Sequence, residues 1–136
     1  MRHLVKLCVG VSDVAYLFER AEALRAADKH LVIHTRQMPK AADELLAGGS
    51  LYWVVKGQIL VRQPIVALTA VGTKDAPLCE IALAPDIVLT RPQPRRPFQG
   101  WRYLSSEDAP PDLESFTAGE GLPQDLEAQL RDLGAW

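Results

Sequence analysis

Cysteine is scarce in this chain of 136 residues: only Cys8 and Cys79 are present, 71 positions apart and each in an apolar stretch. A single pair of cysteines is too few for a small secreted domain, which depends on several disulfides. No Cys-x-x-Cys motif occurs, and the three histidines lack the spacing of metal ligands. We therefore predict two buried, reduced thiols, with no metal site and no cofactor.

Long apolar runs are also missing. No stretch approaches the roughly 18 residues that a membrane-spanning helix needs, and the first ten residues lack the cleavage site of a signal peptide. These absences predict a cytoplasmic protein that does not enter a membrane. Catalytic motifs are equally sparse, because neither a Walker glycine loop nor a Gly-x-Ser-x-Gly elbow is present. The sequence thus favours a binding protein over an enzyme.

A large net charge is absent from the whole chain but not from its parts. The 15 Lys and Arg residues against 17 Asp and Glu give a formal charge of −2. Residues 1–104 carry 14 basic and 9 acidic side chains, a net +5, whereas residues 105–136 carry 1 basic and 8 acidic, a net −7. We predict one domain over 1–136, with a basic α+β body (1–104) followed by an acidic connector and a C-terminal helix (105–136).

Short strands outnumber helices in the pattern of apolar residues. We predict strands at 3–9, 31–35, 50–71, 78–83, 87–90 and 101–104, and helices at 14–24, 39–46 and 124–133. Ser12 or Asp13 is expected to cap the first helix. The stretch 50–71 is expected to split at a tight turn at Gly57 and again near Pro64, which marks an edge or a bulge because proline cannot donate to a ladder. The fold class is α+β, with a bent mixed or antiparallel sheet, about three helices, and closure into a small barrel as one way to complete it.

The most unusual segment is 91–103, which contains four arginines, three aromatic residues and no acid. Guanidinium groups pair with phosphates and aromatic rings stack on unpaired bases, so this composition suits single-stranded RNA or a nucleotide-like anion. A structural role is the alternative, in which the aromatic rings fill the core and the arginines are solvated or paired with the acidic tail. The residues predicted to bind the ligand are Arg95, Arg96 and Arg102 for phosphate, Phe98 or Trp101 for stacking, and Lys40, Lys56 and Arg62 for the wider basic surface.

A group of polar residues lies at the end of the strand at 31–35 and the start of the helix at 39–46. His34, Thr35 and Arg36 precede a short helix, where a phosphate could bind, and His34 is a weak catalytic candidate with Asp43 or Glu44.

In the strand at 50–55, alternate side chains point to opposite faces. One member of the Tyr52–Trp53 pair should therefore lie in the core, and the other near Lys56 on an open face.

Three stretches carry a resemblance to a known family: Pro39-Lys-Ala-Ala-Asp-Glu-Leu-Leu46, Gly48-Gly-Ser-Leu-Tyr-Trp-Val-Val-Lys-Gly57 and Arg95-Arg-Pro-Phe-Gln-Gly-Trp-Arg-Tyr-Leu104. With them the chain resembles the bacterial family named domain of unknown function 1489, which supplies no catalytic residues. The order of a short helix ending in Leu-Leu-x-Gly-Gly, a strand and successive hairpins is also similar to the PUA-like group with its ASCH and EVE relatives. That likeness implies a small pseudo-barrel that binds RNA or modified bases.

Three functions therefore remain open at the level of the sequence. The first is binding of single-stranded RNA or a nucleotide-like anion by the Arg/aromatic segment. The second is a protein-interaction module whose basic segment binds an acidic partner, and the third is a small enzyme that uses His34. If the acidic tail (105–136) folds over the basic segment, it should lower the affinity for an anion.

Overall fold

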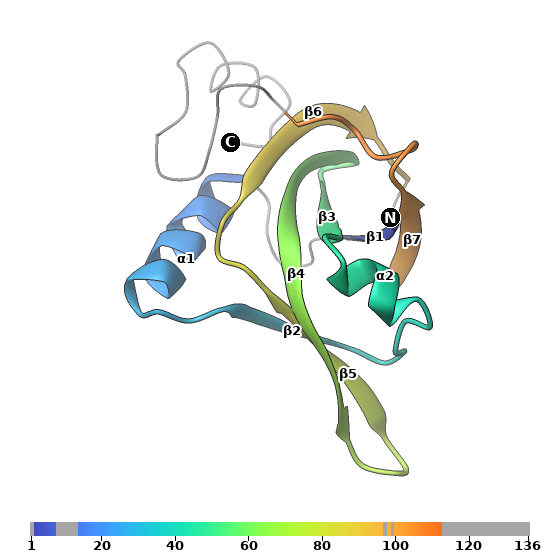
Figure 1. Cartoon of the computed structure of the whole chain (residues 1–136). Helices are drawn as coiled ribbons and strands as arrows, with labels where there is room; N and C mark the ends of the chain where they lie inside the picture. The colour runs from blue at the N-terminus through green and yellow to red at the C-terminus, as the bar shows by residue number, and fades with distance from the viewer. Residues whose placement is uncertain (1, 8–13, 97, 99, 113–136) are drawn as a thin grey trace.

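The structure is a computed structural model that describes residues 2–7, 14–96, 98 and 100–112. Two helices and seven strands lie in this part of the chain (Figure 1). They are β1 (Arg2–Leu7), α1 (Val14–Ala26), β2 (Leu31–Thr35), α2 (Ala42–Leu46), β3 (Ser50–Val55), β4 (Gln58–Gly72), β5 (Pro77–Leu83), β6 (Val88–Pro94) and β7 (Trp101–Ser105). The predicted helix at 124–133 and the predicted caps Ser12 and Asp13 lie outside the described residues.

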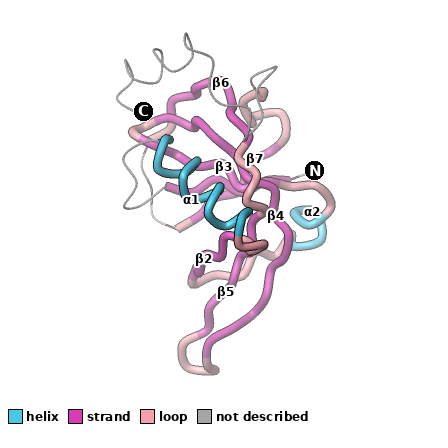
Figure 2. Tube along the Cα trace, turned by 90° about the vertical axis from the view of Figure 1, so that its left-hand side faces the viewer, coloured by secondary structure: helices cyan, strands magenta, loops and turns pink. Residues whose placement is uncertain are grey.

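The seven strands form one mixed sheet, which confirms the predicted α+β class. The order is β2-β5-β4-β3-β1-β7, with β6 paired to β4 as a branch. β1 and β3 are parallel, and the other pairs are antiparallel. The first half of the long strand β4 lies between β3 and β6, whereas its second half pairs with β5 and extends as an arm away from the rest of the sheet (Figures 1 and 2).

The expected closure into a barrel is wrong for the described part of the chain. The strand order ends at β2 on one side and β7 on the other, and these two strands do not pair with each other. The reason is that β4 changes partners along its length: β3 and β6 pair with its first half, and β5, which carries β2 on its other edge, pairs with its second half. The sheet therefore divides along β4 instead of closing.

The turn at Gly57 is confirmed, and so is a bulge next to Pro64, although β4 does not split there. Lys56 and Gly57 have φ values of 52° and 79°, and two consecutive residues with positive φ are typical of a type I′ hairpin turn. β4 runs without interruption through Pro64, whose missing N–H is tolerated opposite Ser50, the first residue of β3. The Pro64 carbonyl accepts a hydrogen bond from the Ala84 N–H, and the register with β5 shifts between Ile65 and Ala67. Pro64 thus marks a change of pairing partner and a bulge.

Both faces of the sheet are covered by packed side chains. The larger core cluster contains Trp53 and residues of α1, whereas the smaller one contains Tyr52 and lies under Phe98 and Ala109. Tyr52 and Trp53 are each 5% exposed, so the prediction that one of them faces an open surface is wrong. The prediction that Tyr52 and Trp53 point to opposite faces of the sheet is correct. The face that carries Tyr52 is covered by segments from later in the chain. Cys79 is buried with a free thiol, as predicted, and burial raises the pKa of that thiol; Cys8 lies outside the described residues.

Candidate anion-binding site

The arginine-rich segment 91–103 covers the end of β6, the connection to β7 and the start of β7, and the connection contacts the hairpin turn at Gly57. The backbone N–H of Arg95 donates to the carbonyl of Gly57, with 2.8 Å between N and O, which places Arg95 beside the turn that carries the exposed Lys56. The half-buried ring of Phe98 lies 5.4 Å from the Arg95 guanidinium and 5.3 Å from that of Arg102. Phe98 is therefore in contact with two other predicted residues, and its ring already forms cation–π contacts with both of them.

The aromatic residues of β7 hold the segment that joins β2 to α2. The indole N–H of Trp101 donates to the carbonyl of Gln37 at 2.9 Å, and the Tyr103 hydroxyl accepts from the Ala41 N–H at 3.0 Å. The two rings meet edge to face with centroids 4.9 Å apart, and the Arg2 guanidinium lies 5.1 Å from the Tyr103 centroid. Trp101 also packs against the larger core cluster, so it serves structure as well as surface.

A pocket of about 580 Å³ opens next to Trp101, and we call it the β7 pocket. Each of its charged lining side chains is basic. Lys6 enters from β1, opposite Trp101 in the antiparallel pair, while Arg102 enters from β7 itself. The complete lining is Lys6, His34, Thr35, Arg36, Gln37, Gly100, Trp101 and Arg102. Three cationic side chains around one concave surface make a site suited to an anion.

A second hollow, of about 490 Å³, continues along β7 and shares Gln37 and Trp101 with the β7 pocket. Its basic residues are Arg2 and Lys40, and Tyr103 contributes an exposed ring. One carboxylate is present, because Glu44 forms an ion pair with Arg2 at 3.2 Å. Together the two hollows bring basic side chains from β1, β7 and the segment after β2 next to the Trp101–Tyr103 pair, and we call this surface the β7 strip.

The structure places three of the eight predicted binding residues, Lys40, Trp101 and Arg102, in the two hollows. Arg102, Trp101 and His34 line the β7 pocket, Lys40 lines the adjoining hollow, and Arg95 and Phe98 contact or flank Arg102. Arg96 is exposed at the end of β6, and Lys56 is exposed in the neighbouring turn. Sequence reasoning missed Lys6 and Tyr103 as members of the site. These two residues come together because β1 pairs with β7, and no local pattern in the sequence predicts that pairing.

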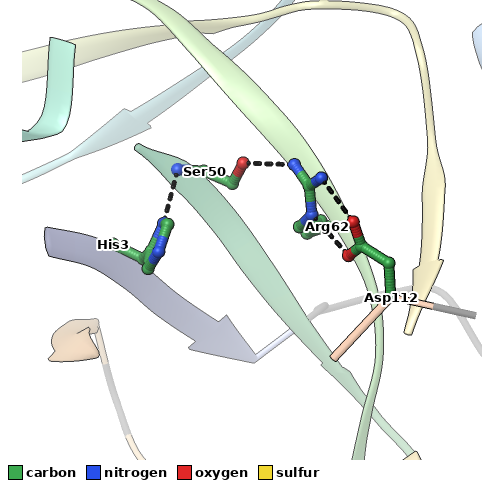
Figure 3. Close-up of polar contacts among 4 residues, drawn as sticks. All are labelled: His3, Ser50, Arg62 and Asp112. Atoms are coloured by element: carbon green, nitrogen blue, oxygen red, sulfur yellow. Dashed lines mark hydrogen bonds and ion pairs between the residues drawn. The ribbon is translucent and has the colours of Figure 1, made fainter. Parts of the chain in front are cut away.

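Arg62 lies elsewhere, in a polar network that Figure 3 shows with His3, Ser50 and Asp112. Its Nε and one terminal nitrogen each donate to a carboxylate oxygen of Asp112 at 2.8 Å, and its other terminal nitrogen donates to Ser50 Oγ at 2.8 Å. The hydrogen bonds from Arg62 hold the pKa of Asp112 below its usual value, and the same bonds raise the pKa of Arg62. The prediction that Arg62 extends the basic surface is corrected, because its charge is compensated by Asp112.

His3 occupies the other end of this network. Its Nδ1 accepts the Ser50 backbone N–H at 3.0 Å, so in the neutral ring the proton is on Nε2, 3.3 Å from Ser106 Oγ. Burial, followed by the charge of Arg62, lowers the pKa of His3. This tautomer cannot take a proton from Ser106 through Nε2, and therefore the pair does not form a serine–histidine nucleophile. The sequence carries no signal for this network, since its members are up to 109 positions apart.

The weak catalytic candidate His34 has a partner other than the predicted ones. Its Nε2 lies 3.3 Å from Oε1 of Glu80, the residue opposite it in the β2–β5 pair, and both side chains are substantially exposed. Glu44 pairs with Arg2. An exposed cross-strand pair of this kind contributes little energy and has no buried base.

Neither a metal-binding group of side chains nor a membrane-spanning helix is found in the part of the chain that the structure describes. No group of three His, Cys, Asp or Glu side chains there could hold a metal ion. None of the helices that the structure describes is both long and apolar enough to span a bilayer.

Comparisons with known proteins identify a family. Neither the curated proteins nor the solved structures contain a match to this chain, so the PUA-like resemblance receives no support from them. The family model described as protein of unknown function (DUF1489) matches residues 4–136, almost the whole chain. The match includes the β7 strip apart from Arg2 and the Arg62 network apart from His3, and the chain belongs to the DUF1489 family.

Proposed function

We propose that the protein binds a phosphate-bearing ligand, single-stranded RNA or a nucleotide, along the β7 strip. The observation that carries this proposal is the β7 pocket, whose charged lining residues Lys6, Arg36 and Arg102 are all cations. A volume of about 580 Å³ falls in the range of small-molecule sites. Guanidinium groups bind phosphate oxygens in pairs, which favours arginine at such a site.

The aromatic residues of the strip suit the remainder of a nucleotide. Tyr103 is 36% exposed and lies next to Trp101, which lines both hollows. Stacking of one base on an exposed aromatic ring is worth about 1–3 kcal/mol. Phe98 was predicted as a residue that stacks on a base. Its ring contacts Arg95 and Arg102, and in this proposal it orients their guanidinium groups.

The test is binding of a short fluorescein-labelled single-stranded RNA, followed by fluorescence anisotropy. We expect affinity to fall steeply between about 50 and 200 mM salt, because each phosphate contact releases a counterion. The double variant Arg36→Gln, Arg102→Gln should bind at least tenfold more weakly. The matched control is Arg20→Gln, Lys74→Gln, which removes the same charge from the exposed side of α1 and the tip of the β4–β5 arm. Equal affinity of the two double variants would contradict the proposal.

The alternative is a protein-interaction module that binds an acidic partner through the same cations. The edge-to-face aromatic pair beside the pocket favours RNA, because an acidic peptide needs the charges but not the rings. Competition decides between them: polyglutamate should displace the RNA far less effectively than unlabelled RNA of equal charge. An RNA-binding role, like the reduced Cys79, fits a protein of the cytoplasm.

A further inference from the structure

A third pocket, of about 390 Å³, lies beside the Arg62 network, between the end of β7 and the beginning of β3. Its polar lining residues are His3, Tyr52, Arg62, Ser106 and Asp112, and its apolar wall is formed by Ala109, Pro110 and Pro111. We call it the Tyr52 pocket. The Tyr52 pocket shares no lining residue with the β7 pocket, so a ligand could bind in it whether or not RNA binds in the β7 pocket.

Tyr52 supplies the observation that points to a ligand. Only 5% of the Tyr52 surface is exposed, and its ring packs edge to face on His3 with centroids 5.2 Å apart. Its hydroxyl has no hydrogen-bond partner within the described residues. Every fully buried side-chain oxygen or nitrogen among the described residues has a hydrogen-bond partner. The Tyr52 hydroxyl has none, so it is not fully buried, and it opens to the pocket that Tyr52 lines. A largely buried phenol with an unused donor and acceptor is costly unless something polar meets it.

The electrostatics of the Tyr52 pocket favour an uncharged ligand. The charge of Arg62 is neutralised by the two-point ion pair with Asp112. His3 is held in its neutral form because Nδ1 accepts the Ser50 N–H, and protonation there would break that bond beside Arg62. An anion would have to displace Asp112, and a cation would meet Arg62.

The remaining hydrogen-bonding capacity defines the chemistry further. Each Asp112 oxygen accepts one bond from Arg62 and retains a second lone pair, so the carboxylate can accept an N–H from a ligand. The Tyr52 hydroxyl can donate to a carbonyl. The proline and alanine wall accommodates a flat apolar face. We infer that the Tyr52 pocket binds an uncharged planar heterocycle with a ring N–H and a carbonyl group, the chemistry of a nucleobase edge.

The experiment uses the full chain and uridine, an uncharged nucleoside with both groups, followed by amide chemical-shift changes in ¹H–¹⁵N spectra. Uridine at millimolar concentration should shift resonances around Tyr52, Ser106 and Asp112. Tyr52→Phe removes one hydroxyl and should weaken binding about fivefold, and 3-methyluridine, which lacks the ring N–H, should lose a similar factor. Thr69→Val, which removes an exposed hydroxyl from the arm, is the matched control and should bind uridine normally.

The outcomes separate this inference from the proposed function. Arg36→Gln with Arg102→Gln should leave uridine binding intact, because those residues line the other pocket. Absence of uridine shifts, or equal binding by folded Tyr52→Phe, would overturn the inference while leaving RNA binding to be judged by its own test. Shifts produced by acetate but not uridine would also overturn it, because they would identify an anion site that exchanges Asp112.

Discussion

Arg62 and Asp112 join strand β4 to the start of the acidic segment through a two-point ion pair, with both nitrogen–oxygen distances at 2.8 Å. Neighbouring contacts reinforce this attachment. Thr90 of β6 forms an isolated bridge with Asp112, and the Arg91 N–H donates to the Pro111 carbonyl at 2.9 Å. Pro111 and Asp112 are therefore attached to β4 and β6, and residues 105–112 line neither hollow of the β7 strip.

Asp112→Asn should destabilise the fold by about 1 kcal/mol. The ion pair is bidentate but half-exposed, which keeps its worth near the upper end for surface pairs. The contribution has a definite pH dependence: the pKa of Asp112 is depressed in the folded state, so its stabilisation is present above its usual pKa of 3.8 and is lost as pH falls through the lower folded value. Urea unfolding at neutral pH measures the change. A change below about 0.3 kcal/mol would show that the pair is too solvated to matter.

His3 predicts a second pH effect in a different range. The pKa of His3 is lowered in the folded state, so the unfolded chain takes up a proton first as pH falls below 6.5. Stability attributable to neutral His3 is complete above that pH and declines as pH falls toward and through the folded pKa. Urea unfolding of the parent chain and of His3→Gln at about pH 7.5 and about pH 5 tests this. The variant should lose less stability between the two conditions. Identical pH profiles would remove His3 as the cause.

Local features of the fold followed from the sequence, whereas features that depend on distant packing did not. The strand Leu31–Thr35 and the turn at Gly57 were predicted correctly, because apolar periodicity and the conformational freedom of glycine act within a few residues. Tyr52 was not, since Phe98 and Ala109 cover its face from more than 40 positions away.

The candidate site divides in the same manner. The composition of residues 91–103 identified Arg102 and Trp101, both of which line the β7 pocket. Arg62 was predicted to extend the basic surface because its partner Asp112 follows 50 residues later, and charge along the chain does not reveal which carboxylate reaches which arginine. His3 could not be found at all, because its role depends on the Ser50 N–H of a neighbouring strand.

Gly57 and Gly49 should respond very differently to alanine. Gly57 has φ near 79° with open space where a Cβ would lie, so Gly57→Ala meets only backbone strain and should cost about 1–2 kcal/mol. A Cβ on Gly49 would lie 2.5 Å from the Arg2 carbonyl oxygen and 2.6 Å from that of Leu45, where backbone must move. Gly49→Ala should therefore cost more, which unfolding in urea measures. The reverse order of the two destabilisations would contradict the packing of α2 against β1.

Arg95→Ala with Arg96→Ala should weaken binding of single-stranded RNA and also reduce its salt dependence. If each guanidinium neutralises one phosphate, the slope of log affinity against log salt should become shallower by about 1.4, at about 0.7 per contact. Anisotropy titrations at several salt concentrations measure the slope, with Arg20→Gln, Lys74→Gln as the charge-matched control. An unchanged slope would restrict the phosphate contacts to the residues that line the β7 pocket.

Shortening the chain after Asp112 tests whether the acidic tail opposes RNA binding. Residues 113–136 carry five acidic and one basic side chain, a net −4, so their removal changes the formal charge of the chain from −2 to +2. Less long-range repulsion should raise RNA affinity at low salt, and the cut preserves the Arg62–Asp112 pair. Circular dichroism first checks that the shortened chain is folded. A gain that disappears in high salt indicates repulsion through solvent, because exposed charges are screened there, whereas a gain that persists indicates that the tail directly covers the strip. Unchanged affinity at low salt would contradict both forms of autoinhibition.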